Sequence, residues 1–434
     1  MTPNPVWRNW TGEQVCSPAT MARPTSEAEL VEIVARGARR GQPVRAVGSG
    51  HSFTDCACTD GLMIDMTGLQ RVISADPASG RVTVQGGAKL HALGEQLAAH
   101  GLGLANQGDI DAQSITGATA TATHGTGARF PNLSAQLVSL RLVTAAGEVV
   151  DLAADDACRD DYLAARVSLG ALGVISQVTV QTVPLYTLHR RDEPRGLTET
   201  LDRLDEYVDG NDHFEFFVFP YTDVALTRTT RRSTEEPTPT PRWKRRIHES
   251  IENGGFGLIC RAGRRLPAAA PQLNRLITAM MTPATVSDHA YKVYATQRKV
   301  KFTEMEYAIG REHARPAIEA VIEVVRRQRL PILFPLEVRF AAGDDALLST
   351  AQGRDTCYIA VHQYCGMEFE PFFRAVEQIM ADYDGRPHWG KHHYHRADTL
   401  RACYPHWDRF AGVRDRLDPE RVFANDYTRR VLGA

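Results

Sequence analysis

Two segments with almost no bulky side chains constrain the fold of this 434-residue chain more than any other feature. The first reads GSGHSF, covers residues 48–53 and directly follows a predicted strand at residues 43–47. The second reads SITGATATATHGTG and covers residues 114–127. Such segments pack poorly as ordinary core, but they let the backbone approach a flat ligand or a pyrophosphate closely. Two of them in one α+β unit predict a dinucleotide held by backbone amides.

The first segment on its own does not establish a nucleotide site. It departs from the GxGxxG fingerprint at Phe53, and a turn-like stretch follows where a Rossmann loop would open a helix. Taken alone it fits an ordinary glycine turn equally well. The second small-residue segment is what favours the cofactor interpretation.

The hydrophobic pattern predicts alternating helices and strands over residues 1–184. We expect helices at residues 26–41 and 90–101, and strands at residues 43–47, 62–66, 72–73, 82–84, 137–143, 149–152 and 173–180. Farther along, we expect strands at 300–309 and 330–340, and helices at 317–327 and 370–380. Residues 229–252 are polar and basic, and we expect them to form an exposed excursion.

Charge and cysteine usage narrow the class of protein. Lys+Arg total 50 and Asp+Glu total 52, so no bulk polycation is present to hold nucleic acid. The eight cysteines include no CxxC pair, which is typical of reduced thiols, and we expect a cytoplasmic or peripherally membrane-associated enzyme. Four histidines at 388, 392, 393 and 395 lack a carboxylate or cysteine at ligand spacing, so we expect no metal.

Several longer motifs, in order, resemble the FAD domain of the vanillyl-alcohol-oxidase type. Within that type the chain resembles the sugar-1,4-lactone oxidoreductases, most closely the L-gulono-1,4-lactone dehydrogenases of actinobacteria. The resemblance runs nearly end to end. The motifs are GSGHSFTDCACTDGLMIDM at 48–66, the segment 114–127, SLGALGVISQVTV at 168–180, EVRF at 337–340, GRPHWGKHHY at 385–394 and LDPERVFANDY at 417–427.

The resemblance implies an α+β fold with two domains. A two-subdomain FAD-binding domain would comprise residues 1–184, with residues 400–434 returning to it. Residues 185–399 would form an α+β cap with a mostly antiparallel sheet, and the pocket would lie between the two domains.

The resemblance also implies how the cofactor is held. His51 matches a histidine that is joined covalently to the flavin; the alternative is that it only hydrogen-bonds within its loop. Residues 107–127 contain no cysteine, so we expect no second attachment. The other residues expected to bind FAD are Val47, Gly48, Ser49, Gly50, Ser52, Ser114, Gly117, Thr121, Thr123, His124, Gly125 and Ile175.

Three charged residues are expected to act on the substrate. Glu337 and Arg339 are two apart on a predicted strand, so their side chains leave the same face. On their spacing alone, Glu337 and Arg339 could be a surface ion pair. The resemblance instead aligns both with residues that bind the substrate. Lys391 matches the lysine of an HWxK motif, and we expect Arg339 to crowd it; Ser114 matches a serine that contacts substrate. Which group removes the hydroxyl proton is left open.

The implied reaction is FAD-dependent oxidation of an aldono-1,4-lactone, such as L-gulono-1,4-lactone, to an ascorbate-type product. Electrons would pass to a cytochrome, a quinone, a dye or oxygen. Two alternatives remain: an oxidase of alditols or other sugars on the same fold, and a flavin-binding electron-transfer protein without turnover.

One residue bears on the electron acceptor. Family members that act as oxidases often have glycine just before the Thr-His pair, where this chain has Ala122. Its methyl group would narrow the path of oxygen to the flavin. The alternative is that Ala122 simply packs against the sheet.

Overall fold

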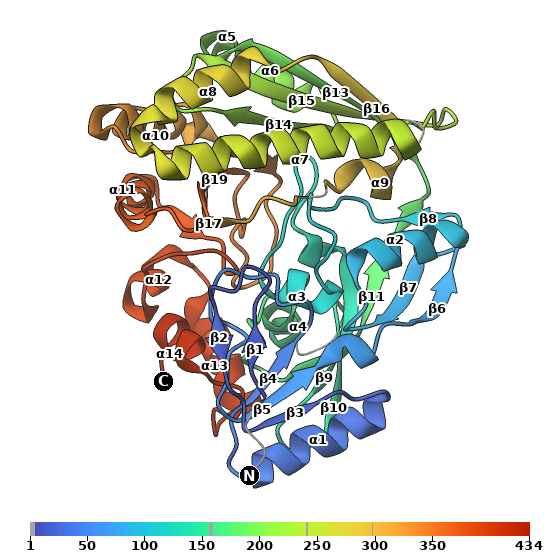
Figure 1. The fold of residues 1–434 in the computed structure, drawn as a ribbon. Coiled ribbons are helices and arrows are strands. Elements are labelled where there is room, and N and C mark those ends of the chain that lie inside the picture. The colour runs from blue at the N-terminus through green and yellow to red at the C-terminus, as the bar shows by residue number, and fades with distance from the viewer. Residues whose placement is uncertain (1–4, 156–158, 240–241, 297) are drawn as a thin grey trace.

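The computed structural model describes residues 5–155, 159–239, 242–296 and 298–434. An N-terminal half built on two small sheets lies below a half built on one large sheet (Figure 1). This is the α+β architecture expected from the sequence, with a mostly antiparallel sheet in the second half.

The first small sheet is parallel and carries the first glycine segment. Its strand order is β3-β5-β4, with β3 at Thr20–Ala22, β5 at Leu62–Asp65 and β4 at Val44–Val47. Helix α1, Glu27–Arg39, begins where the Ser26 side chain accepts a hydrogen bond from the Glu29 amide. Leu30 and Val34 of α1 are fully buried against the sheet. Strand β4 ends at Val47, immediately before Gly48.

The second small sheet is antiparallel and has the order β10-β9-β11-β7-β6. Its strands are β6 Val72–Asp76, β7 Arg81–Gln85, β9 Leu137–Val143, β10 Val149–Ala153 and β11 Val174–Gln181. Helices α2, Leu90–Ala99, and α4, Arg159–Arg166, share its core. The second glycine segment is not a loop throughout, because residues Ile115–Ala120 form helix α3. Ser114 caps this helix by accepting a hydrogen bond from the Gly117 amide at 3.3 Å.

The large sheet has eight strands in the order β16-β13-β15-β14-β18-β19-β17-β20. They are β13 Thr187–Gly196, β14 His213–Val218, β15 Val224–Ser233, β16 Ala284–His289, β17 Phe302–Gly310, β18 Leu336–Ala341, β19 Thr356–Tyr364 and β20 Arg386–Pro387. The helices α5 Leu197–Asp202, α6 Leu204–Asp209, α10 Ala314–Gln328 and α11 Glu370–Ala381 contribute to its apolar core. Charged side chains occupy the other face, which looks toward the N-terminal half.

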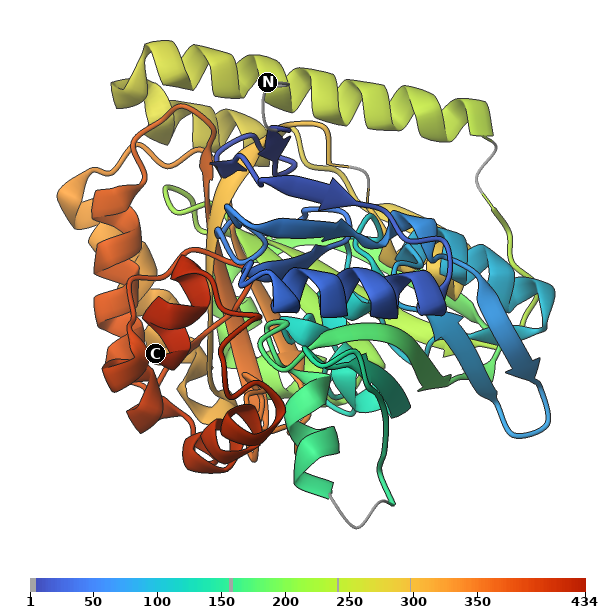
Figure 2. The same cartoon turned by 90° about the horizontal axis from the view of Figure 1, so that it is seen from below.

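Residues 229–252 differ from expectation. Strand β15 continues to Ser233 and pairs with both β13 and β14, so the start of this stretch belongs to the sheet. From Arg242 the chain forms the 24-residue helix α7, which ends at Arg265 and runs along the outside of the molecule (Figure 2). Helices α8, Ala270–Ala279, and α9, Ala290–Tyr294, follow it. Because this stretch is polar, the sequence did not indicate that it contains the end of a strand and the beginning of an outer helix.

The C-terminal helices return to the N-terminal half (Figure 1). They are α12 Ala397–Cys403, α13 Trp407–Leu417 and α14 Asp426–Leu432. Leu400, Phe410 and Val431 share one apolar core with the five-stranded sheet. Among the described residues, no helix is long and apolar enough to span a membrane.

Two short antiparallel pairs complete the fold. Strands β8, Leu102–Gly103, and β12, Val183–Pro184, pair at the end of β11. Strands β1, Trp7–Arg8, and β2, Val15–Cys16, form an N-terminal arm. The arm lies beside the first glycine segment.

Candidate active site

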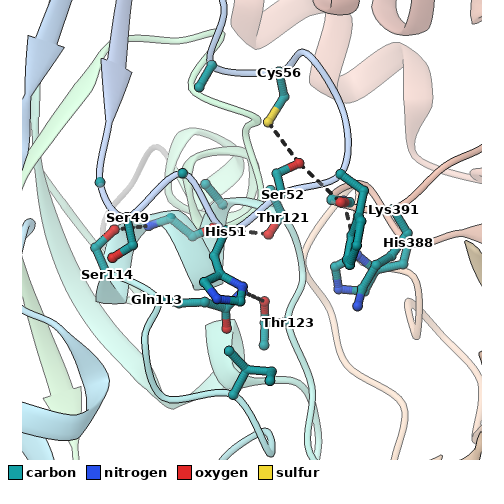
Figure 3. Close-up of a pocket in the computed structure, with 18 of the residues that line it drawn as sticks. Ser49, His51, Ser52, Cys56, Gln113, Ser114, Thr121, Thr123, His388 and Lys391 are labelled. Atoms are coloured by element: carbon teal, nitrogen blue, oxygen red, sulfur yellow. Dashed lines mark hydrogen bonds between the residues drawn. The ribbon is translucent and has the colours of Figure 1, made fainter. Parts of the chain in front are cut away.

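A long cavity, partly open to solvent, lies between the N-terminal half and the large sheet, and Figure 3 shows some of the residues that line it. Residues of both glycine segments and of the large sheet line this one cavity, as a site between two domains requires. The expected site residues that line it are Val47, Gly48, Ser49, Gly50, His51, Ser52, Ser114, Gly117, Thr121, Thr123, His124, Ile175, Glu337, Arg339 and Lys391. Gly125 instead lines a small neighbouring cavity, since it packs against residues 106–107.

The two glycine segments touch at the wall of the cavity. A Cβ atom added at Gly48 would lie 2.0 Å from the Ser114 hydroxyl oxygen. Gly50 has a φ of +61°, and a Cβ atom there would lie 2.8 Å from the Trp7 ring. Glycine is therefore required at both positions by close approach, and at Gly50 also by backbone conformation.

Unpartnered polar atoms suit this wall to a polar ligand. The Ser49 hydroxyl and the Gln113 side-chain oxygen are buried, and neither has a hydrogen-bond partner in the part of the chain that the structure describes. Buried polar groups are ordinarily hydrogen-bonded, so both are free for a bound molecule. With the closely packed glycine segments, they fit the phosphates and ring system of FAD.

His51 projects into the cavity from the first segment (Figure 3). Its ring stacks on Trp10 with 4.5 Å between the centroids and 8° between the planes. Burial and the nearby Lys391 charge lower the pKa of His51 to about 4. The imidazole is therefore neutral at pH 7, which leaves a ring nitrogen with a free lone pair.

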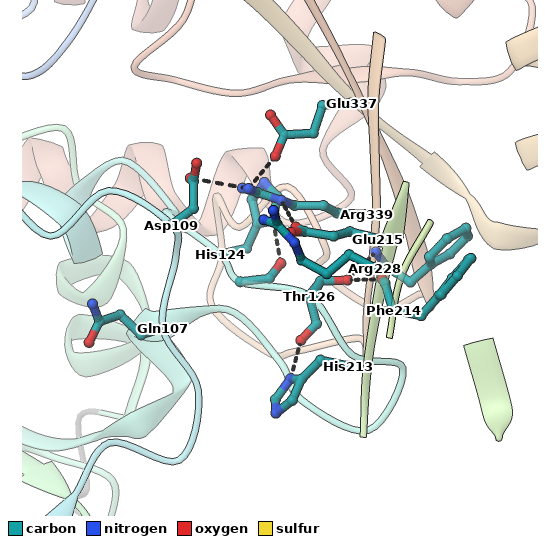
Figure 4. A network of polar contacts seen from close by, with 12 residues as sticks. Gln107, Asp109, His124, Thr126, His213, Phe214, Glu215, Arg228, Glu337 and Arg339 are labelled. Atoms are coloured by element: carbon teal, nitrogen blue, oxygen red, sulfur yellow. Dashed lines mark hydrogen bonds and ion pairs between the residues drawn. The ribbon is translucent and has the colours of Figure 1, made fainter. Parts of the chain in front are cut away.

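Arg339 is enclosed by carboxylates (Figure 4). Its Nε donates to Glu215 at 2.8 Å, its Nη2 lies 3.1 Å from Asp109, and Nη2 also contacts Glu337. Burial alone would lower the pKa of Arg339, but these carboxylates raise it well above its ordinary value. The predicted same-face placement of Glu337 and Arg339 holds, whereas their burial rules out the simple surface pair.

Lys391, which we expected Arg339 to crowd, forms an ion pair with Glu304. The Lys391 ammonium donates to one Glu304 oxygen, and the other lies 3.4 Å from His362 Nε2. Burial alone would raise the pKa of Glu304, but Lys391 and His362 lower it to about 2. His362 Nε2 also lies 3.8 Å from Glu337, so Lys391 and Arg339 belong to one buried polar chain.

Sequence reasoning missed Asp109, Glu215, Arg298 and Glu304. Arg298 joins the network by pairing with Asp109 at 2.5 Å and with Glu337 at 3.4 Å. A signal for Glu304 was present in the sequence, because charged and apolar residues alternate from Glu304 to Tyr307 on strand β17. Asp109 lies in an irregular segment where no such period exists.

His124, Glu306 and His388 form a separate buried cluster. His124 Nδ1 lies 2.8 Å from the Gly125 carbonyl and Nε2 lies 3.1 Å from Glu306. His388 Nδ1 accepts a hydrogen bond from the Gly390 amide at 3.0 Å, so its Nε2 carries the hydrogen when the ring is neutral. That nitrogen is then a donor, which suits a hydrogen-bonded cluster better than metal ligation.

Comparison with known proteins places the chain in a family. Residues 178–431 match the family model described as D-arabinono-1,4-lactone oxidase, and residues 18–153 match one described as FAD binding domain. The chain belongs to the D-arabinono-1,4-lactone oxidase family. It is 71% identical to the L-gulono-1,4-lactone dehydrogenase of Mycobacterium tuberculosis, over 99% of this chain and 100% of the relative.

More distant relatives agree. The chain is 33% identical to the L-gulonolactone oxidase of Mus musculus and 28% identical to an alditol oxidase of a Streptomyces species, each over 98% of both chains. Cholesterol oxidase of Brevibacterium sterolicum has the same fold, with a TM-score of 0.81 at 18% identity over 99% of this chain and 97% of that chain. The family and the FAD-domain fold inferred from the motifs are thus confirmed.

Proposed function

We propose that this protein oxidises an aldono-1,4-lactone, L-gulono-1,4-lactone or a close analogue, with FAD as cofactor. The observation that carries this proposal is the 71% identity over the whole chain to an L-gulono-1,4-lactone dehydrogenase. The pocket supports it because the two glycine segments line the same cavity as Glu337, Arg339 and Lys391. The secondary hydroxyl beside the lactone carbonyl is the group oxidised, which gives an ascorbate-type product.

Each side chain of the pocket has a separate role toward the substrate. Bound FAD supplies the acceptor for the hydride. Arg339 donates hydrogen bonds to substrate oxygen and stabilises the negative charge that develops there. Glu337 fixes Arg339 and accepts a hydrogen bond from a substrate hydroxyl, while Ser114 contacts the substrate from the other wall. Lys391, held by Glu304 as an ammonium, supplies positive charge beside the hydroxyl oxygen while its proton is removed.

We assign the FAD-binding role to residues 1–184 and 400–434 and the substrate role to the cap, residues 185–399. Electrons leave the flavin to a cytochrome, a quinone, a dye or oxygen.

The second candidate substrate is an alditol, which the 28% identity to an alditol oxidase favours. Turnover with a dye acceptor separates the two: we expect kcat/KM at least tenfold higher for L-gulono-1,4-lactone than for xylitol. A preference for xylitol would contradict the lactone assignment.

We expect FAD to be attached covalently through His51. After acid precipitation of the wild-type protein, the yellow colour should stay in the pellet, and a flavin-bearing peptide should contain His51. His51→Ala should fold and hold FAD that acid releases, since the glycine segments supply the backbone contacts. Complete release of flavin from the wild type would contradict attachment but would leave the FAD requirement standing.

Glu304→Gln should lower the rate of flavin reduction by lactone about tenfold to 100-fold. The amide is nearly isosteric but removes the negative charge paired with Lys391, so the ammonium loses its fixed position. Stopped-flow reduction without oxygen measures the effect. As a control, Glu370→Gln changes an exposed carboxylate on α11 and should keep the wild-type rate.

The reduced enzyme should pass electrons to a cytochrome or dye faster than to oxygen. Ala122 is fully buried with a φ of +58°, a conformation that glycine adopts without strain. Ala122→Gly should therefore fold and raise the rate constant for oxygen severalfold. The Ala122 side chain packs in the core of the five-stranded sheet. If the variant and the wild type react equally fast with oxygen, Ala122 only packs in the core and does not restrict the access of oxygen.

A further inference from the structure

The N-terminal arm forms hydrogen bonds with the loop that carries His51. It precedes the two segments matched by family models, which begin at residues 18 and 178. Asn9 donates its side-chain amide to the Ser52 carbonyl at 2.8 Å, and the Trp10 amide donates to the Gly50 carbonyl at 3.1 Å. The Trp7 ring closes over Gly50. The arm thus holds Gly50 and Ser52, the two residues on either side of His51.

The same arm also contacts strand β17 of the large sheet. Glu13 accepts a hydrogen bond from the Thr303 hydroxyl at 3.2 Å and lies 3.6 Å from His392 Nε2. The Trp10 ring meets the Phe302 ring edge-on at 5.6 Å. Because the arm contacts both β17 and the loop, it fixes the loop relative to the cap wall of the cavity.

Trp10 sets the orientation of the His51 ring. The two rings are nearly parallel, so the indole occupies one imidazole face and blocks rotation toward the arm. Trp10 itself lines the cavity, and its indole N–H is buried without a hydrogen-bond acceptor among the described residues. The contact with the His51 imidazole is made by the face of the indole ring, not by its N–H group.

We propose that Trp10 is a positioning residue for covalent flavin attachment, holding the His51 imidazole edge toward the flavin. This rests on the proposed function, which supplies FAD and the electron acceptor. A bond forms between a His51 ring nitrogen and the methyl carbon on the benzenoid ring of the flavin. One proton leaves that methyl group and one leaves the imidazole. The two electrons released enter the flavin ring system and pass to a dye or oxygen.

The burial of His51 also suits its ring nitrogen to bond formation. His51 has a pKa lowered to about 4 by burial first and by Lys391 second, with Glu304 and Asp109 acting in the opposite sense. The ring needs no base to expose its lone pair at pH 7. Orientation, not deprotonation, is then the condition that the arm satisfies.

The test compares flavin attachment in apoprotein made under riboflavin limitation. FAD and a dye acceptor are added, samples are denatured in detergent over time, and covalent flavin is read as in-gel fluorescence. Trp10→Ala should attach flavin about tenfold more slowly, while non-covalent FAD affinity changes less than twofold. Trp10→Phe, which keeps the stack, should stay within about threefold of wild type. Val15→Ala, an exposed position in the same arm, is the matched control.

Three results would overturn the proposal. The first is a wild-type attachment rate in Trp10→Ala, and the second is a loss that only parallels lost FAD affinity or a lower Tm. The third is wild-type protein that carries no covalent flavin. If Trp10→Ala does not fold, Trp10→Leu keeps apolar bulk without a ring and carries the same expectation. Anaerobic reduction by lactone is measured separately on each variant, so failure of the proposed function is seen independently of attachment.

Discussion

Arg339→Ala and Lys391→Ala should each slow anaerobic reduction of the flavin by lactone about 100-fold to 1000-fold. In the proposed function each change removes a cation beside the reacting oxygen, and loss of one preorganised electrostatic contact typically has an effect of this size. FAD content should remain near that of the wild type, because the glycine segments lie on the other wall of the cavity. Stopped-flow absorbance measures the rates, and the flavin spectrum measures the content.

Two further variants test whether the effect is specific to the pocket. Glu337→Gln should act more weakly, through a displaced Arg339 and one weakened substrate contact. Arg374→Ala removes an exposed arginine that pairs with Glu370 on α11, and it should leave the rate unchanged. Near-normal reduction rates in both the Arg339 and Lys391 variants would show that the substrate lies elsewhere.

Gly48→Ala should abolish tight FAD binding. The added Cβ atom would lie 2.0 Å from the Ser114 hydroxyl, so one of the two glycine segments must move. Since Ser114 caps α3, the displacement reaches both glycine segments that we expect to hold the cofactor. Purified variant should contain less than about a tenth of the wild-type flavin, and titration with FAD should show affinity lowered at least 100-fold.

A glycine in open space provides the control. Gly412 lies in α13 with nothing within 4 Å of its added Cβ. Gly412→Ala should keep full flavin content and raise the free energy of unfolding by up to about 1 kcal/mol, since alanine favours helix. Equal flavin content in the two variants would contradict the close-approach role of Gly48.

The regular elements were predictable because their hydrophobic periods are strong. Strand β4 at Val44–Val47 and helix α10 at Ala314–Gln328 fall where the pattern places them. Helix α3 was missed because a run of Ala, Thr and Gly has no apolar period, and its formation depends on a cap and on packing. Strand β15, Val224–Ser233, was missed because most of its residues are threonines and arginines, which give no clear apolar alternation.

The site was predictable only along single strands. A spacing of two shows that Glu337 and Arg339 share a face, but not that Glu215 lies opposite Arg339 on the neighbouring strand. Asp109, Arg298 and Glu304 reach the pocket from three other segments, and no local pattern encodes that convergence. Strand order and register supplied the network, and both are fixed by tertiary packing.

The most direct test of lactone oxidation uses the purified, FAD-loaded protein without oxygen. L-Gulono-1,4-lactone is added stepwise, and the visible absorption band of the flavin is followed. We expect the band to bleach with close to one equivalent of lactone per flavin and to return when a dye acceptor is added. A band that persists under excess lactone, although dithionite bleaches it, would contradict the assignment of this protein as a lactone-oxidising flavoenzyme.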